Sequence, residues 1–363
     1  MAARPHVASL LEDAWHRRLA STMTRRGWGT RVLAYTGYGS TERVRILGRV
    51  LMSRRPYRRM ATHSGASWIE LRNADRMRRG WRAFFTAPAM GEEVTITLGG
   101  ASIVARADRS GIIDVELEGH GLPPGLHTAR LTSPRAADAE AEIHVVDPAE
   151  TFGLVSDIDD TVIATALPRP LIAAWNTFIK AEGTRRPVPG MATMYRELLR
   201  DHPGAPIVYV STGAWNTVPL LTRFLRRNGY PLGPLLMTDW GPTNTGWFRS
   251  GQAHKEACLE RLARELPEID WILVGDDGQH DPSIYAEFTE THPDHVRAVC
   301  IRMLSPAEQI LSHFAFGANE DIRRHHTRDI PLCKGSDGYA LLSLMRRVIG
   351  TTKPPDPVLR SSW

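Results

Sequence analysis

Three aspartates follow a short apolar segment near the middle of the chain. The segment 152–155, FGLV, has the length and composition of a buried parallel strand. Asp157, Asp159 and Asp160 come directly after it. Carboxylates crowded at the end of a buried strand repel one another, so a fold keeps them only when their charge is compensated. A bound cation is the usual compensation, and oxygen ligands suit Mg²⁺; the alternative is an acidic turn that only caps a helix.

Two later apolar segments also end in polar residues. Residues 206–210 lead into Ser211, and residues 269–274 lead into Asp276. Between them Lys255 opens a predicted helix, and it is one of only four lysines in a chain whose other basic residues are mainly arginine. Ligands bind beyond the carboxyl ends of the strands in an open α/β sheet, so we expect these side chains to share one site.

The composition limits the class of protein. With 363 residues, 42% of them hydrophobic and 23% charged, the chain is typical of a soluble protein of two domains. Its longest apolar runs are only as long as strands, so we expect no transmembrane segment. Glu12 and Asp13 lie where a signal peptide would be apolar, which predicts a cytoplasmic protein. The three cysteines lack metal-ligand spacing and are expected to be reduced and structural.

The first 80 residues are strongly basic. They hold roughly 17 arginines against about five acidic residues. Within them, residues 6–20 place apolar side chains at helical spacing and predict an amphipathic helix. We favour a helix docked on its own domain; the alternative is a helix that lies on an anionic membrane, which would make the protein a peripheral membrane protein. The arginines lack the interleaved aromatic residues of a nucleic-acid groove, so no nucleic-acid partner is expected.

The hydrophobic pattern divides the chain into two kinds of structure. From about residue 43 to residue 146, short segments with a period of two predict an antiparallel, sandwich-like domain of roughly seven strands. After residue 150 strands alternate with helices, which predicts a parallel sheet covered on both faces. The predicted units are an amphipathic basic helix (1–30), a β-sandwich-like domain (31–148), an α/β domain (149–350) and a carboxyl-terminal tail (351–363).

The polar groups follow the order of the four signature motifs of the haloacid-dehalogenase (HAD) superfamily of phosphohydrolases, which the chain resembles. The first motif, D-x-D-x-T, is matched by Asp157, Asp159 and Thr161. The fourth, G-D followed by a second aspartate, is matched by Asp276 and Asp281. More narrowly, the chain resembles the catalytic domain of the actin-patch-associated, magnesium-dependent phosphatidate phosphatases, which also occurs in bacterial proteins. The matching stretches are SDIDDTV (156–162), RPVPGM (186–191), YVSTGAWN (209–216), HK (254–255) and LVGDDGQHDPSIY (273–285).

The resemblance implies a fold and a mechanism. The fold would be an α/β, HAD-like Rossmannoid domain with a parallel sheet and a minimal cap, because the stretches on either side of Ser211 are too short for a large lid. Asp157 would be the nucleophile that forms an aspartyl-phosphate. Asp159 would protonate the leaving group as general acid and later activate water as general base. Ser211 and Lys255 would hold the transferring phosphoryl oxygens.

The same motifs imply the remaining site residues. The implied catalytic residues are Asp157, Asp159, Thr161, Ser211 and Lys255. The implied substrate-binding residues follow Ser211 and are Thr212, Gly213, Trp215 and Asn216. The implied ligands of Mg²⁺ are the carboxylate of Asp157, the backbone carbonyl of Asp159, the carboxylate of Asp276, and Asp281.

The implied function is hydrolysis of a phosphomonoester, with phosphatidate as the substrate and diacylglycerol as the product, in lipid metabolism. A site without a large cap suits a bulky or membrane-embedded substrate, so a phospholipid is the expected partner. Two alternatives stay open. One is a HAD phosphatase that acts on soluble phosphomonoesters or phosphoproteins, and the other is a non-catalytic binding protein.

Overall fold

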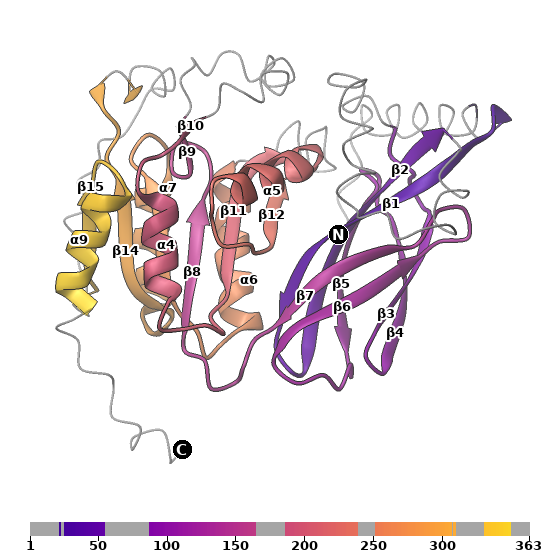
Figure 1. Cartoon of the computed structure of the whole chain (residues 1–363), viewed down its shortest axis with the longest axis horizontal. Coiled ribbons are helices and arrows are strands. Elements are labelled where there is room, and N and C mark those ends of the chain that lie inside the picture. Colours follow the sequence, from indigo (N-terminus) through magenta and orange to yellow (C-terminus); the bar gives the residue numbers. More distant parts are fainter. Residues whose placement is uncertain are drawn as a thin grey trace, which may run out of the picture.

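The computed structural model describes residues 22, 25–54, 87–164, 186–238, 251–306, 308–309 and 330–349. These residues form a mostly antiparallel sheet and a parallel sheet that lie beside each other (Figure 1). A further two-stranded sheet pairs β9 (Ile163–Ala164) with β10 (Arg186–Pro187). The predicted combination of an all-β part and an α/β part is therefore confirmed.

The first sheet is built from strands in which buried and more exposed residues alternate. In β3, for example, Val94, Ile96 and Leu98 are buried and the residues between them are not. The sheet has the strand order β4-β3-β6-β7-β1-β2-β5. Its strands are β1 (Trp28–Gly39), β2 (Arg43–Arg54), β3 (Glu93–Leu98), β4 (Ala101–Arg106), β5 (Ile112–Glu118), β6 (Gly125–Thr132) and β7 (Ala139–Val145).

The first sheet differs from the predicted antiparallel sandwich in two ways. One neighbouring pair, β1 and β7, is parallel. The strands also belong to one continuous sheet, and its edge strands β4 and β5 contact each other, so that the sheet curls towards a barrel. Alternation along each strand predicts which side chains face the core, but it does not specify which edges meet. The described part of this sheet has seven strands, and the first of them, β1, was not among the strands predicted.

Strand β1 lies before residue 43, where the sequence pattern predicted the first strand. Two of its glycines allow close strand pairing. A Cβ atom on Gly37 would lie 2.3 Å from the carbonyl oxygen of Arg45, and one on Gly39 would lie 2.2 Å from that of Arg43. The β1–β2 register shifts between Tyr35 and Tyr38, directly beside these glycines.

The parallel sheet forms the centre of the α/β part. Its strand order is β12-β11-β8-β13-β14-β15, and the neighbouring strands are parallel. All six residues of the central strand β8 are buried, as a strand covered on both faces requires. The strands are β8 (Phe152–Asp157), β11 (Ile207–Ala214), β12 (Leu235–Thr238), β13 (Asp270–Asp276), β14 (Val296–Arg302) and β15 (Leu332–Gly335).

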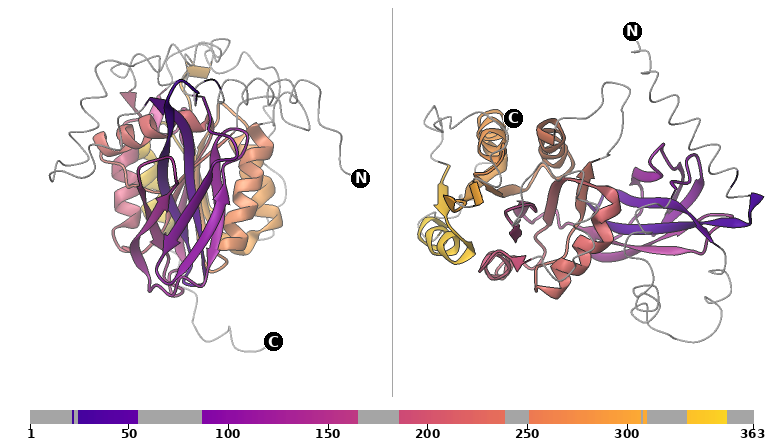
Figure 2. Two further views of the ribbon diagram at one scale, coloured as in Figure 1. Left: turned by 90° about the vertical axis from the view of Figure 1, so that its right-hand side faces the viewer. Right: turned by 90° about the horizontal axis from the view of Figure 1, so that it is seen from above.

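Helices cover both faces of the parallel sheet (Figure 2). One face carries α4 (Met191–Leu199), α5 (Val218–Arg227) and α9 (Gly338–Ile349), and the other carries α6 (Gly251–Glu265) and α7 (Asp281–Thr291). Short 3₁₀ turns, η4 (Trp215–Thr217) and η5 (Pro293–His295), lead into α5 and β14. None of the helices in the described part of the chain is long and apolar enough to cross a membrane.

Two predictions concern residues outside the described ranges. They are the amphipathic helix over residues 6–20 and the carboxyl-terminal tail (351–363). The prediction of a minimal cap likewise depends on residues 165–185 and 239–250, which lie outside those ranges.

The two sheets share a core and a charged junction. Tyr35, Tyr38 and other residues of the first sheet belong to the same buried cluster as the parallel strands. The Tyr35 ring stacks on Trp215 in η4, with ring centroids 5.8 Å apart. Glu265, at the end of α6, accepts hydrogen bonds from Tyr38 Oη at 2.7 Å and from Arg45 Nε at 3.0 Å. The first sheet therefore packs against two elements that also reach the carboxyl ends of the parallel strands.

Replacing Glu265 with alanine tests how much this junction contributes to stability. The change removes the carboxylate that Arg45 and Tyr38 share, while Arg45 keeps its ion pairs with Asp114 and Glu116, so we expect the free energy of unfolding to fall by about 2 kcal/mol. In the matched control, Glu93→Ala, an exposed ion pair with Arg106 is lost, and the expected cost is below about 1 kcal/mol. Urea unfolding measures both variants, and equal losses would contradict a stabilising junction.

Candidate active site

Two buried carboxylates lie at the ends of neighbouring strands. Asp157 is the last residue of β8 and Asp276 is the last residue of β13, the adjacent strand. Asp281, in the first turn of α7, is directed towards the same place. The three side chains are buried, and one carboxylate oxygen from each lies within 4.8 Å of those of the other two. The sequence analysis assigned Asp157, Asp276 and Asp281 to one site, and the fold brings their carboxylates together.

The loop after β13 holds two of these carboxylates by backbone contacts. The amide of Gly278 donates to Asp276 Oδ1 at 2.8 Å, and the amide of Asp276 lies 3.4 Å from Asp281 Oδ2. Gly275 lets Asp281 approach, because a Cβ atom there would lie 2.5 Å from Asp281 Oδ2. A side chain at position 275 would therefore displace Asp281, which explains why the G-D motif has glycine there.

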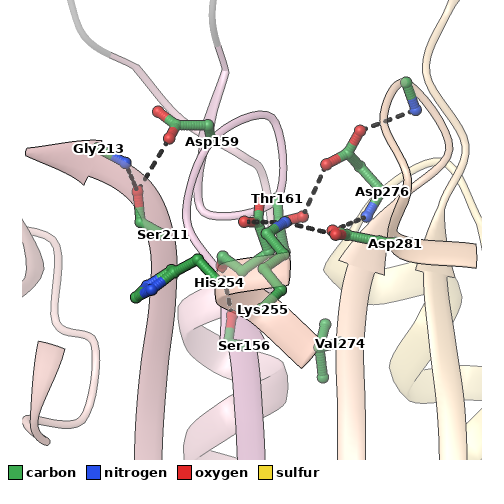
Figure 3. A network of polar contacts seen from close by, with 12 residues as sticks. Ser156, Asp159, Thr161, Ser211, Gly213, His254, Lys255, Val274, Asp276 and Asp281 are labelled. Carbon is green, nitrogen blue, oxygen red and sulfur yellow. Dashed lines mark hydrogen bonds and ion pairs between the residues drawn. The ribbon is translucent and has the colours of Figure 1, made fainter. Parts of the chain in front are cut away.

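Lys255 is the cation of the cluster. It comes from the first turns of α6 and is buried, with its Nζ 2.6 Å from Asp157 Oδ1. It also forms an ion pair with Asp281, which Figure 3 shows beside it. Burial opposes its charge, but Asp157, Asp281 and Asp276 together raise the pKa of the ammonium above its ordinary value. Lys255 therefore carries a positive charge at neutral pH.

One ammonium does not balance three carboxylates. Burial raises the pKa of Asp157 well above its ordinary value; Lys255 opposes this shift and Asp281 adds to it. Burial likewise raises the pKa of Asp276, and Asp281 and Asp157 add to that shift. In the described structure Asp157 Oδ2 is buried and has no hydrogen-bond partner. An unpartnered oxygen within an all-oxygen, net negative cluster fits a hard divalent cation.

Asp159 and Ser211 form a second group beside the carboxylate cluster (Figure 3). Asp159 is partly exposed, and its Oδ2 accepts a hydrogen bond from Ser211 Oγ at 3.1 Å. Ser211 Oγ in turn accepts a hydrogen bond from the amide of Gly213 at 3.0 Å. On the other side of the same turn, Thr161 Oγ1 lies 3.4 Å from Asp276 Oδ2. The turn 158–163 thus directs Asp159 towards β11 and Thr161 towards β13.

The predicted substrate-binding residues differ in their surroundings. Gly213 lies in the site through its amide, and Thr212 is partly buried on the same strand. Trp215 is only 8% exposed, and its ring is stacked on Tyr35 of the first sheet. Asn216 Oδ1 is buried without a hydrogen-bond partner among the described residues. The substrate-binding roles of these residues stay predictions.

Arg302 is not among the predicted site residues, although it belongs to the same edge of the sheet. It ends β14 and is 5% exposed, and its Nη1 donates to the carbonyl oxygen of Asp160 at 2.6 Å. A sequence signal for it exists. Like Asp157 and Asp276, it is a charged residue at the carboxyl end of an apolar segment with strand composition.

Part of the chain matches a known protein family. Residues 152–303 match the family model described as the catalytic domain of phosphatidate phosphatase APP1. This part of the chain, which is less than half of it, therefore resembles the catalytic domain of APP1. It contains Asp157, Ser211, Lys255 and Asp276.

Two curated relatives were found. Phosphatidate phosphatase APP1 of Saccharomyces cerevisiae is 24% identical over 216 residues, which are 56% of this chain and 35% of that protein. An uncharacterised protein of Schizosaccharomyces pombe is 24% identical over 163 residues, which are 45% of this chain and 26% of that protein. The chain thus spans about a third or less of the length of these relatives. Among solved structures, a carbohydrate acetylesterase from Xanthomonas citri superposes with a TM-score of 0.25 at 9% identity, over 77% of this chain and 70% of that chain.

The Asp276→Asn variant tests the electrostatic cost of the carboxylate cluster when no cation is supplied. Because the pKa of Asp276 is raised, the folded state binds this proton more tightly than the unfolded chain. The penalty is therefore absent below the ordinary pKa of 3.8 and grows as the pH rises. We expect the variant to melt at a higher temperature in chelator, by roughly 2–4 °C for each kcal/mol relieved, and the gain to be larger at pH 8 than at pH 5.

Thermal unfolding in EDTA at both pH values measures this effect. Asp138→Asn removes a charge from an exposed ion pair with Arg130 and serves as the control. It should change stability by no more than about 0.5 kcal/mol. If Asp276→Asn melts at a lower temperature at pH 8, the carboxylate stabilises the cation-free fold, and the electrostatic account of the cluster is wrong.

Proposed function

We propose that the chain is a magnesium-dependent phosphomonoester hydrolase of the HAD type. The observation that carries the proposal is the arrangement at the ends of β8 and β13. There a nucleophile candidate, Asp157, contacts a buried ammonium and two further carboxylates, while Asp159 lies two residues away on a turn. A phosphomonoesterase needs this combination, since it requires a nucleophile, an acid for the leaving group and positive charge around the phosphoryl oxygens.

The reaction would proceed in two transfers. In the first, the Asp157 carboxylate attacks phosphorus, the bond from phosphorus to the ester oxygen breaks, and Asp159 gives its proton to the departing alkoxide. This step leaves an aspartyl-phosphate on Asp157 and a free alcohol. In the second, Asp159 takes a proton from water as that water attacks phosphorus. The bond between phosphorus and Asp157 breaks, inorganic phosphate is released, and both aspartates return to their starting states.

The charges of the site support this assignment of roles. Lys255 is held at Asp157 and would place its ammonium beside the phosphoryl oxygens, where negative charge develops. When substrate binds, Ser211 would turn its hydroxyl proton from Asp159 to the same phosphoryl group, while the Gly213 amide holds the hydroxyl oxygen. Mg²⁺ would be held by Asp157, Asp276 and Asp281 together with the Asp159 carbonyl, and it would supply positive charge that draws the phosphate and the Asp157 carboxylate together.

The surroundings of Asp159 suit an acid that later becomes a base. Unlike Asp157 and Asp276, it is partly exposed, so a leaving group or a water molecule can reach it. Its carboxylate is oriented by the hydrogen bond that Ser211 Oγ donates to Oδ2. An acid-base group must lie within hydrogen-bond reach of the transferred proton, and the 158–163 turn places Asp159 beside the nucleophile.

Phosphatidate is the substrate that we propose, with diacylglycerol as product. Its support is the name of the matched family and of the yeast relative, both of which are phosphatidate phosphatases. A phospholipid substrate would bring the protein to a membrane surface from the cytoplasm as a peripheral protein. Soluble phosphomonoesters and phosphoproteins are the alternative substrates, since the chemistry at phosphorus is the same for all of them.

Phosphate release from a panel of esters tests the function. The panel contains phosphatidate in mixed micelles, a short-chain soluble phosphatidate, a soluble sugar phosphate and a phosphopeptide, each with Mg²⁺ and with EDTA. We expect release from both phosphatidates with Mg²⁺ and none in EDTA. Asp157→Asn and Asp159→Asn should each lower turnover by about 10²-fold or more, since one removes the nucleophile and the other the acid. Near wild-type turnover in either variant would contradict the mechanism, and release from the phosphopeptide alone would contradict the substrate.

Lysine at position 255 should not be replaceable by arginine. Arginine has the same charge, but its planar fork is larger than an ammonium and cannot take the same place between Asp157 and Asp281. We expect Lys255→Arg to lower kcat by about a hundredfold, comparable to the loss of one preorganised donor in a transition state. Lys334→Arg, at an exposed position of β15, is the control and should leave kcat unchanged. Equal activity of the two variants would remove Lys255 from the mechanism.

A further inference from the structure

Arg302 connects three segments at the carboxyl edge of the parallel sheet. Its Nη1 donates to the carbonyl oxygen of Asp160 at 2.6 Å, across the end of β13 from β14. Its Nε donates to the carbonyl oxygen of Ser336 at 3.3 Å, and its Nη2 lies 2.6 Å from Glu308 Oε1. Its own carbonyl oxygen accepts the amide of Asp277 at 3.0 Å. Because Arg302 is buried and has this many defined partners, the fold fixes the position of its guanidinium.

The carbonyl that Arg302 binds belongs to a strained residue. Asp160 has φ +60°, and it is the non-glycine residue with a positive φ in the described part of the chain. This left-handed conformation costs about 1–2 kcal/mol for a residue with a Cβ atom. The amide of Asp160 donates to the carbonyl oxygen of Ile163 at 2.8 Å. Both backbone polar groups of Asp160 are thus held, one within the turn and the other by Arg302.

The strain bears directly on the neighbouring residue. A change in the backbone of Asp160 that is not confined to one peptide plane shifts the Cα atom of Asp159, because the two residues are adjacent in the same short turn. That shift would move the Asp159 side chain, whose Oδ2 lies 3.1 Å from Ser211 Oγ. Holding Asp160 in place therefore also holds Asp159 in place.

We propose that Arg302 is a positioning residue that fixes the 158–163 turn and thereby aims Asp159 at the leaving-group oxygen. The expected effect on catalysis rests on the proposed function, whereas the expected effect on the conformation of the turn does not. Arg302 does not touch the reacting atoms; it acts through the carbonyl of Asp160. Because its charge is balanced by Glu308, its contribution to the site is geometric.

The need for Asp159 as an acid depends on the leaving group, so displacement of Asp159 should affect different substrates unequally. An alkoxide leaving group must be protonated as the ester bond breaks, whereas p-nitrophenolate leaves readily without a proton. Displacement of Asp159 should therefore lower kcat/KM for a short-chain phosphatidate much more than for p-nitrophenyl phosphate. A general loss of folded protein, or a general distortion of the phosphate site, would lower both values by the same factor.

Arg302→Met is the main variant, because methionine fills much of the same buried space without donating hydrogen bonds. We expect kcat/KM to fall roughly 10- to 100-fold for the short-chain phosphatidate and by less than about threefold for p-nitrophenyl phosphate. Arg302→Lys can donate one bond to Asp160 and should recover part of the loss. Arg297→Met, on the same strand at the end away from the site, should leave the ratio of the two values unchanged.

Amide hydrogen exchange tests whether Arg302 holds the 158–163 turn, and it does so without any catalytic assay. Peptides that cover residues 158–163 should exchange about tenfold faster in Arg302→Met than in the wild type or in Arg297→Met, because one anchor of the turn is lost. Glu308→Gln keeps the bond to Asp160 and should leave this exchange unchanged. Unchanged exchange in Arg302→Met overturns the proposal, as does an equal loss of kcat/KM on both esters. If the wild type hydrolyses neither ester, the proposed function is refuted. Faster exchange in Arg302→Met would in that case still support the positioning role.

Discussion

The structure depends on the burial of three carboxylates against one ammonium. Asp157 and Asp276 end adjacent strands, and Asp281 is brought to them by α7. Their mutual repulsion would separate the strand ends if those ends were free to move. They are not free, because β8 and β13 lie in the middle of a parallel sheet whose two faces are both covered by helices. The apolar core thus offsets the repulsion between the carboxylates, and a cation bound at this edge would stabilise the fold further.

The same constraint gives the first sheet a structural part in the site. It packs on α6, which carries Lys255 near its beginning and Glu265 at its end, and on η4, which follows Ser211 and Gly213. Lys255 on α6 and Ser211 on β11, the strand directly before η4, are the two residues predicted to hold phosphate. The elements that deliver the carboxylate cluster, β8 and β13, lie deeper in the parallel sheet. The first sheet therefore supports the side of the site that we propose holds phosphate more directly than the side that we propose holds a cation.

Local sequence patterns predicted those features that each segment determines alone. A strand buried on both faces must be apolar throughout, so β8 and β13 could be recognised, and so could the aspartates that end them. Features that depend on distant segments could not be predicted in this way. Trp215 has the sequence surroundings of a site residue, yet its ring is covered by Tyr35, which lies 180 positions earlier in the chain. The curl of the first sheet and the parallel pairing of β1 with β7 likewise arise from contacts between remote strands.

Lys255 and Arg302 are two buried cations at the same edge of the sheet, and the geometry of each side chain suits different partners. Lys255 meets carboxylates, Asp157 and Asp281, and a compact ammonium can approach both closely. Arg302 meets backbone carbonyls and a carboxylate in several directions, and only a fork with separate donors can satisfy them together. The chain uses arginine for most of its positive charges, so the lysine is explained by its partners and not by its charge. Each cation therefore acts on a different part of the first motif: Lys255 on the carboxylate of Asp157, and Arg302 on the backbone that carries Asp159.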